Sequence, residues 1–201
     1  YMEKIFGECY NIYCITEYKN TDEDSSVMTK YTEFSDKSFG RIILAATDFG
    51  LSHVIFPDMT QGESARARLA IMDAQRDDEA IKSIVETLSQ YFAGERMEFT
   101  DIPVDLSNCR PFQRDALNIT RRILYGEVRS YKWLATHLGK PKASRQVGQA
   151  LARNPVAIII PCHRVIGSDG SLTGYGLGLS MKRRLLTMEG SVSHSVIKNS
   201  R

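Results

Sequence analysis

An apolar run that ends at a proline is followed directly by a cysteine with two basic neighbours. The sequence here reads Ile158-Ile159-Ile160-Pro161-Cys162-His163-Arg164-Val165. β-Branched runs of this kind are typical of buried strands, and proline cannot continue a hydrogen-bonded ladder. We therefore expect a buried strand that stops at Pro161 and holds Cys162 at the end of a rigid element.

The neighbours of Cys162 make it a candidate nucleophile. Positive groups beside a thiol favour the thiolate, which is the reactive form. The alternative is an inert core cysteine, since free cysteines are among the most buried residues. His163 and Arg164 favour the nucleophile, so we predict a thiol that ionises easily.

The net charge of +2 conceals an uneven distribution over the 201 residues. Residues 1–106 carry 20 acidic and 10 basic side chains, whereas residues 107–190 carry 4 acidic and 14 basic ones. Such an excess of +10 suggests that the second half meets a polyanion, and a solvated basic face is the alternative. No apolar run reaches the length of a membrane span, and the four cysteines lack a disulfide-framework spacing, so we expect a cytoplasmic location.

The first half has the pattern of a small sheet with helices on it and offers no catalytic cluster. Short apolar runs separated by turn residues predict an antiparallel meander of strands. Helical spacing of apolar residues predicts the helices, the second of which is stopped by Gly94. The expected strands are 31–34, 40–46 and 52–56, and the expected helices are 63–73 and 79–92.

The second half has the pattern of short helices joined by glycine turns. Ser130 is the expected N-cap of a helix that ends before Gly139, and Ser180 that of the last helix, which Gly190 closes. The expected helices are 112–124, 130–138, 142–152 and 181–189, and the middle two form a helix-turn-helix candidate. Gly148 lies inside the basic third helix, where close approach to DNA and packing between helices both explain a glycine.

Two other uses of Cys162 fit the sequence less well. A cysteine protease needs a histidine that is usually distant in sequence, whereas His163 follows the cysteine directly. A zinc site would need two more ligands, and the candidates show no standard spacing. These candidates are Cys9, Cys14, His53, Cys109 and His137.

Four motifs occur together in the second half of the chain. They are Gly126-Glu127-Val128-Arg129-Ser130-Tyr131, Gly139-Lys140-Pro141-Lys142-Ala143-Ser144-Arg145, Asn154-Pro155-Val156-Ala157 continuing into the string around Cys162, and Gly170-Ser171-Leu172-Thr173-Gly174-Tyr175. With these motifs the chain resembles the O6-alkylguanine-DNA alkyltransferases, the methylated-DNA–protein-cysteine S-methyltransferases. The resemblance covers about residues 31–190. It is greatest to the bacterial forms, including the C-terminal half of the adaptive-response protein.

The resemblance implies a mixed α/β (α+β) fold of two domains. Residues 30–106 would form a small ribonuclease-H-like domain with an antiparallel sheet. Residues 107–190 would form a winged helix-turn-helix-like domain that carries the active-site cysteine. Residues 1–29 and 191–201 are expected to be tails, the first of them a linker remnant.

The resemblance also implies a reaction, the transfer of an alkyl group from guanine O6, or thymine O4, to the sulfur of Cys162. Glu189 would hold His163, which would take the thiol proton through a water molecule. Tyr131 would donate a hydrogen bond to the guanine ring nitrogen N3, and Asn154 would brace the turn beside the active-site strand. No step regenerates the thiol, so each molecule would act once.

The target base must leave the DNA stack to reach the thiol, and the resemblance assigns residues to this step. Arg145 would fill the space left by the base, with a phosphate contact as the alternative, and its helix would enter the minor groove. The expected DNA-binding residues are Lys142, Ser144, Arg145, Gly148, Gln149 and Arg153.

The flipped base would lie in a pocket formed by Val165, Tyr175, Gly176 and Leu177. The carbonyls of Cys162 and Val165 would read the guanine amino group, the Gly176 N–H would reach O6, and Tyr175 would pack on the base. Leu177 is bulkier than the glycine of some members, which predicts a preference for methyl over benzyl groups. Arg164 is expected to be structural.

The expected partner is double-stranded DNA that contains O6-alkylguanine. The protein is expected to act as a monomer that needs no cofactor or metal and binds no membrane. Two other interpretations stay open. A lesion-binding relative that flags damage would lack the cysteine that is present here. A DNA-binding regulator with an incidental thiol would bind a specific operator sequence.

Overall fold

Three consecutive strands begin the part of the chain that the computed structural model describes, residues 28–58 and 70–191. They are β1 (Lys30–Asp36), β2 (Gly40–Thr47) and β3 (Gly50–Ile55), and both neighbouring pairs are antiparallel. The predicted meander is therefore confirmed. A fourth strand, β4 (Gln75–Arg76), pairs parallel to β1 and gives the order β3-β2-β1-β4. It was not predicted, because two polar residues show no apolar alternation.

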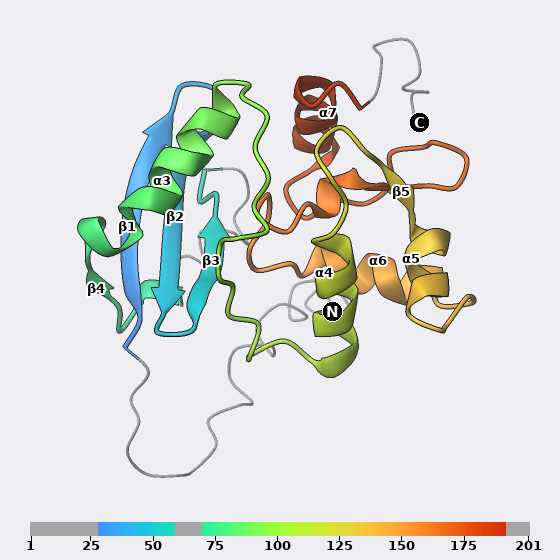
Figure 1. Ribbon diagram of the computed structural model, residues 1–201, viewed down its shortest axis with the longest axis horizontal. Helices are drawn as coiled ribbons and strands as arrows, with labels where there is room; N and C mark the ends of the chain where they lie inside the picture. Colours follow the sequence, from blue (N-terminus) through green and yellow to red (C-terminus); the bar gives the residue numbers. More distant parts are fainter. Residues whose placement is uncertain (1–27, 59–69, 192–201) are drawn as a thin grey trace, which may run out of the picture.

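One long helix, α3 (Asp78–Phe92), covers a face of this sheet (Figure 1). The Asp77 side chain caps it by accepting a hydrogen bond from the Ala80 N–H at 3.0 Å. Its buried residues are Ile81, Leu88, Tyr91 and Phe92, so the helix predicted over 79–92 is confirmed. The helix predicted over 63–73 lies mostly outside the described residues, as do the two tails.

The second half forms four helices, α4 (Pro111–Thr120), α5 (Tyr131–His137), α6 (Ser144–Ala152) and α7 (Leu179–Met188). The Ser130 hydroxyl accepts from the Trp133 N–H at 3.0 Å, so the predicted cap of α5 is confirmed. Gly139, with a φ of 69°, ends that helix and starts the turn to α6. The two helices of the expected helix-turn-helix are thus present and packed together.

Three predicted helix ends in this half are wrong. The first helix stops at Thr120 instead of 124, because the Ile123 carbonyl accepts from the Arg164 guanidinium at 2.6 Å. α6 begins at Ser144, since Lys142 lies in the preceding turn. Ser180 lies inside α7, whose first cap position is Gly178 with a φ of 88°. No helix in residues 28–58 and 70–191 is long and apolar enough to cross a membrane.

The edge strand β3 joins the two halves. Its Leu51 exchanges backbone hydrogen bonds with the connector, at 2.8 Å to the Pro103 carbonyl and 2.9 Å from the Asp105 N–H. A Cβ at Gly50 would lie 2.5 Å from the Pro103 carbonyl carbon, so this approach requires glycine. Further along β3, the Val54 N–H donates to the Pro155 carbonyl at 2.8 Å. The sheet therefore supports the turn that leads to Cys162, and one hydrophobic core runs through both halves.

Candidate active site

The segment before Cys162 is a buried turn, so the strand predicted there is wrong. Ile158 has a φ of 78°, which a continuous strand does not allow, and only isolated bridges occur on either side of it. Cys162 then begins a short 3₁₀ helix, Cys162–Arg164. The apolar side chains are buried as expected, but they fill a turn because a polar group at its base organises the backbone.

That polar group is Asn154, which has three hydrogen bonds within the turn. Its Oδ1 accepts from the Val156 N–H at 3.1 Å, and its Nδ2 donates to the Ile160 carbonyl at 2.8 Å. The same Nδ2 lies 3.1 Å from the Cys162 Sγ. The amide therefore fixes the turn and presents a donor to the sulfur, in agreement with the bracing position expected for Asn154.

A buried carboxylate, Glu189, accepts four hydrogen bonds, two of its donors being the residues that follow Cys162. Its Oε1 accepts from His163 Nε2 at 2.8 Å, from Arg164 Nη2 at 3.0 Å and from the Tyr91 hydroxyl at 2.6 Å. Its Oε2 accepts from Arg164 Nε at 2.9 Å. Burial would raise the pKa of Glu189, but His163 and Arg164 outweigh it and hold this pKa at about 2.

These contacts determine which nitrogen of His163 can act as a base. The carboxylate at Nε2 favours a hydrogen on that nitrogen, so Nδ1 carries the lone pair. Nδ1 is buried and has no hydrogen-bond partner among the described residues. Burial lowers the pKa of His163 despite the opposing influence of Glu189. The ring is therefore neutral at pH 7 and able to accept a proton.

The prediction that basic neighbours make the thiol ionise easily is wrong for this state. Burial raises the pKa of Cys162, and the hydrogen bond from Asn154 and the charge of Lys182 only partly offset it. Arg164, which the sequence places beside the thiol, pairs with Glu189 instead. Arg164 is thus structural, as expected, and proton removal from Cys162 requires a base.

Sequence reasoning missed Lys182, a buried lysine of α7. Its Nζ donates to the carbonyls of Val165 and Thr173 at 2.6 and 3.0 Å, and it lies 3.4 Å from the Tyr131 hydroxyl. Burial lowers the pKa of Lys182 to about 8, while the charge of Cys162 opposes that shift. Its helical spacing with Met181 and Leu185 was the available signal, because it puts a lysine on the apolar face of α7.

The cavity beside Cys162 is small, with a volume of about 10 Å³, and is partly open to solvent. That volume is room for about one water molecule. Three of the four expected base-pocket residues line it, namely Tyr175, Gly176 and Leu177. The fourth, Val165, contributes the carbonyl that Lys182 binds. The Tyr131 hydroxyl donates to the carbonyls of Thr173 and Gly174 at 3.1 and 3.2 Å, so it lies against the same glycine-rich loop.

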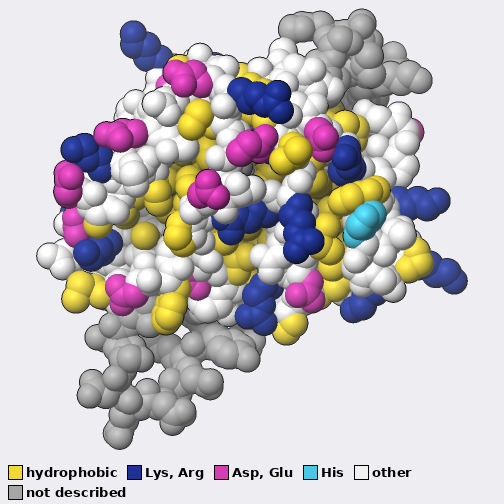
Figure 2. Space-filling view, in the orientation of Figure 1, with side chains coloured by type: hydrophobic (Ala, Val, Ile, Leu, Met, Phe, Trp, Pro, Cys, Tyr) yellow, Lys and Arg dark blue, Asp and Glu magenta, His cyan; other side chains and the backbone are white. Residues whose placement is uncertain are grey.

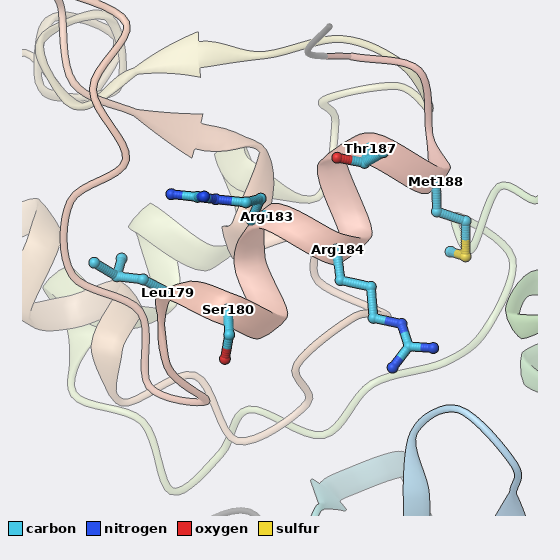
Figure 3. A pocket seen from close by; sticks show the side chains of 6 residues that line it. All are labelled: Leu179, Ser180, Arg183, Arg184, Thr187 and Met188. Carbon is cyan, nitrogen blue, oxygen red and sulfur yellow. The ribbon is translucent and has the colours of Figure 1, made fainter. Parts of the chain in front are cut away.

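A shallow, open pocket lies on the outer face of α7 and is lined by none of the predicted site residues. Figure 3 shows its six lining side chains, which all come from residues 179–188. One of them, Arg184, reaches the first half of the chain, where it donates to the Ser38 carbonyl and stacks over the Phe39 ring at 4.5 Å. This pocket is therefore separate from the cysteine site.

The expected DNA-binding residues lie along one side of the helix-turn-helix. Lys142, Arg145, Gln149 and Arg153 are exposed, whereas Ser144 and Gly148 are half-buried. A Cβ at Gly148 would lie 3.7 Å from the Tyr131 ring, an ordinary contact, so packing inside the protein does not require glycine there. Figure 2 shows Lys and Arg side chains along the end of the molecule that α5 and the following turn occupy.

The described residues bring no three His, Cys, Asp or Glu side chains together in a form that could hold a metal ion. Of the zinc candidates, Cys9 and Cys14 lie outside the described residues. The polar centre is therefore a thiol, an imidazole and a carboxylate next to an exposed basic helix. A thiol beside an imidazole and a carboxylate is typical of nucleophilic catalysis, and an exposed basic helix is typical of nucleic-acid binding.

Two family models match almost all of the described chain. The ribonuclease-like domain of 6-O-methylguanine DNA methyltransferase matches residues 30–106, and the DNA binding domain of the same protein matches residues 111–191. A methylated-DNA–protein-cysteine methyltransferase of Methanosarcina acetivorans is 40% identical over 162 residues, 80% of this chain and 99% of the relative. One from Mycolicibacterium paratuberculosis is 44% identical over 154 residues, 77% of this chain and 88% of the relative.

Solved structures agree with the sequence comparisons. The chain superimposes on Mycobacterium tuberculosis OGT in complex with DNA with a TM-score of 0.69 and 38% identity, covering 81% of this chain and 93% of that one. The chain thus belongs to the family of the 6-O-methylguanine DNA methyltransferases and has the enzyme class of a methylated-DNA–protein-cysteine methyltransferase. The expected fold class is confirmed with it, a sheet domain followed by a helical DNA-binding domain.

Proposed function

We propose that this protein repairs double-stranded DNA by moving one methyl or alkyl group from guanine O6 to the Cys162 sulfur, once per molecule. The observation that carries the proposal is the placement of Cys162 at a cavity, with its sulfur 3.1 Å from the Asn154 amide and with the buried His163–Glu189 pair starting at the next residue of the chain. Transfer to thymine O4 is chemically analogous and belongs to the same proposal.

Activation of the thiol follows from the buried acid–base pair. The Cys162 proton passes to Nδ1 of His163 through a water molecule, and Glu189 stabilises the imidazolium through Nε2. The resulting thiolate accepts the Asn154 amide hydrogen bond and lies in the field of Lys182. Burial disfavours the negative charge of the thiolate in the protein without substrate. The thiolate therefore forms only when these donors and the base act together.

The group transfer itself is a displacement at the alkyl carbon. A sulfur–carbon bond forms, the O6–carbon bond breaks, and its electron pair stays on the guanine. Tyr131 donates a hydrogen bond to guanine N3 and thereby supports the developing negative charge. Lys182 lies 3.4 Å from the Tyr131 hydroxyl, so its charge strengthens this donor, which makes it a positioning residue for the leaving group. Because the product is a thioether, nothing restores the thiol.

The cavity beside Cys162 is small and partly open to solvent, with room for about one water molecule. The flipped base therefore enters from the open side, and the loop of residues 173–178, which borders the cavity, adjusts to it. The Val165 carbonyl keeps a second lone pair for the guanine amino group while Lys182 holds the first. Leu177 narrows the opened pocket, which favours methyl over benzyl adducts.

The exposed residues of α6 bind the DNA backbone and the minor groove, and Arg145 occupies the place of the flipped base. Contacts of this kind tolerate different sequences, because the minor groove carries a degenerate code. Lys142, Ser144, Gly148, Gln149 and Arg153 support the same surface. The partner is thus damaged duplex DNA, which a single copy of the chain binds.

Intact-protein mass measurement after mixing with duplex DNA that carries one O6-methylguanine tests this proposal. The wild type is expected to gain ~14 Da, saturating at one methyl group per molecule, because a thioether is not turned over. Cys162→Ala is expected to bind the same DNA and gain nothing. Tight binding of the lesion without any mass gain in the wild type would instead support a damage-flagging protein.

A further inference from the structure

Tyr91 connects the ribonuclease-like half of the chain to the polar centre of the other half. It lies on α3, is fully buried, and its hydroxyl donates to Glu189 Oε1 at 2.6 Å across 98 residues of sequence. Its ring packs edge-on against Phe99 and Tyr125, with centroids 5.2 and 6.3 Å away. The phenol is therefore held in place by the core and aimed at the carboxylate.

The two oxygens of Glu189 are used unequally. Oε2 accepts one hydrogen bond, from Arg164 Nε, whereas Oε1 accepts three, one of which comes from His163. Tyr91 thus shares with His163 the single oxygen through which the carboxylate acts on the imidazole. It makes the shortest of the four contacts.

We propose that Tyr91 is a positioning residue for alkyl transfer, because its hydroxyl fixes Glu189 Oε1 and shares the negative charge that holds His163. The ribonuclease-like half, whose described residues supply only Val54 to the cysteine cavity, thereby sets the basicity of the proton acceptor in the other half. This inference rests on the proposed transfer to Cys162.

The direction of the effect follows from the hydrogen bonds at Oε1. Without the phenol, Oε1 carries more negative charge and stabilises the His163 imidazolium more strongly, so His163 holds its proton to higher pH. Burial, followed by the charge of Glu189, raises the pKa of Tyr91 well above its ordinary value. The hydroxyl therefore remains a donor throughout the pH range in which His163 titrates.

Other charged or titratable groups face this centre, and all of them stay unchanged when only the hydroxyl is removed. Arg164 and Lys182 lower the pKa of His163, and Glu98 lies 4.0 Å from the Arg164 guanidinium. The remaining groups around the centre are Cys162, Tyr125 and Tyr175. Tyr91→Phe therefore isolates one hydrogen bond.

Tyr125→Phe is the matched control. Its hydroxyl is also close to Glu189, but it donates to the Met188 backbone carbonyl at 3.2 Å and not to the carboxylate. Both variants lose one phenol hydroxyl from the same aromatic cluster. Only the loss at Tyr91 changes the donors on Oε1.

The first measurement is a pH titration of the imidazole ¹⁵N signals in the full-length protein without DNA. The chain has four histidines, and His163→Gln identifies the signal in question. Tyr91→Phe is expected to move the His163 midpoint upward by about half a pH unit, as loss of one donor to its charged partner implies. Tyr125→Phe is expected to leave that midpoint at the wild-type value.

The second measurement is the single-turnover methyl-transfer rate against pH. The acidic limb of the Tyr91→Phe profile is expected to shift with the imidazole midpoint, with affinity for the lesion unchanged within about twofold. Equal midpoints in the wild type and Tyr91→Phe, or equal shifts in both Phe variants, would overturn the inference and leave Tyr91 as a packing residue. Absence of transfer in the wild type would refute the proposed function, whereas the DNA-free titration would still decide the role of Tyr91.

Discussion

The buried centre around Glu189 and the exposed side of α6 both depend on positive side chains, but these are buried and paired in the centre and exposed to solvent on α6. In the centre, Arg164 and Lys182 are fixed by a carboxylate and by backbone carbonyls. On α6, Arg145 and its neighbours are exposed to solvent. Buried pairs are screened little by salt and fail when one partner is lost, whereas exposed charges act additively and weaken with salt. The first region is suited to moving a proton, and the second to binding a polyanion.

Loss of the Glu189 charge should have the largest effect. Glu189→Gln leaves the buried Arg164 without its hydrogen-bonded counter-ion, and among the described residues only Glu98 remains, 4.0 Å away, so we expect a loss of about 3–5 kcal/mol of unfolding free energy. The His163 base also loses its orienting group, so the single-turnover transfer rate should fall at least about 100-fold. Urea unfolding measures the loss of stability, and rapid-quench kinetics measure the transfer rate. A Gln variant that is as stable as the wild type would show that the carboxylate is not the centre of the cluster.

The stability difference between the wild type and Glu189→Gln should also depend on pH. The pKa of Glu189 is about 2 in the folded protein and its ordinary value is 4.5, so its contribution is complete above pH 4.5 and is lost as pH falls towards 2. The stability difference between the wild type and Glu189→Gln should therefore shrink over that range. Parallel stability curves through this range would contradict the low pKa.

Replacement of Lys182 by Met should have the next largest effect, on rate more than on DNA affinity. The variant keeps the length of the side chain and loses the charge that favours the thiolate, so we expect the transfer rate at pH 7 to fall about tenfold. Because the pKa of Lys182 is about 8, the wild type loses the same charge above that pH. The rate difference should shrink as pH rises past 8, and a constant difference would argue against a charge effect.

The exposed region should respond to salt instead. Lys142→Ala and Arg145→Ala are each expected to weaken DNA binding and to reduce the slope of log affinity against log salt by about one. Arg183→Ala, on the outer face of α7, is the control for a general loss of positive charge. Fluorescence-anisotropy titrations at several salt concentrations measure these slopes. Equal losses for all three variants would remove α6 as the specific DNA surface.

Gly148→Ala should have the smallest effect on stability and separates the two explanations of this glycine. Alanine in a helix interior stabilises by about 1 kcal/mol, and the added Cβ meets only the Tyr131 ring, at 3.7 Å. We expect thermal stability to rise and affinity for DNA to fall, because the methyl group occupies space that DNA needs. A gain in stability with unchanged affinity would show that α6 does not approach DNA closely.

Local signals predicted the elements that carry them. Ser130 and Gly139 determine the ends of α5 through a side-chain cap and a left-handed glycine, and both are visible in the sequence. The run 158–160 misled the prediction because its burial suits a strand and a buried turn equally well. The decision depends on Asn154, whose three hydrogen bonds form only after the chain has folded back.

By itself, the sequence determined the family of the chain and the candidate thiol with its neighbouring histidine, since these residues occur in a motif of fixed spacing, and the resemblance to the family added the carboxylate of Glu189. Only the tertiary structure decided the partners and the charge state of that centre. Tyr91 meets Glu189 from 98 residues away, Arg164 turns to Glu189 instead of the thiol, and Lys182 is buried on α7. The physical reason is that burial and long-range pairing control whether a thiol or an imidazole holds its proton, and neither can be read from adjacent residues.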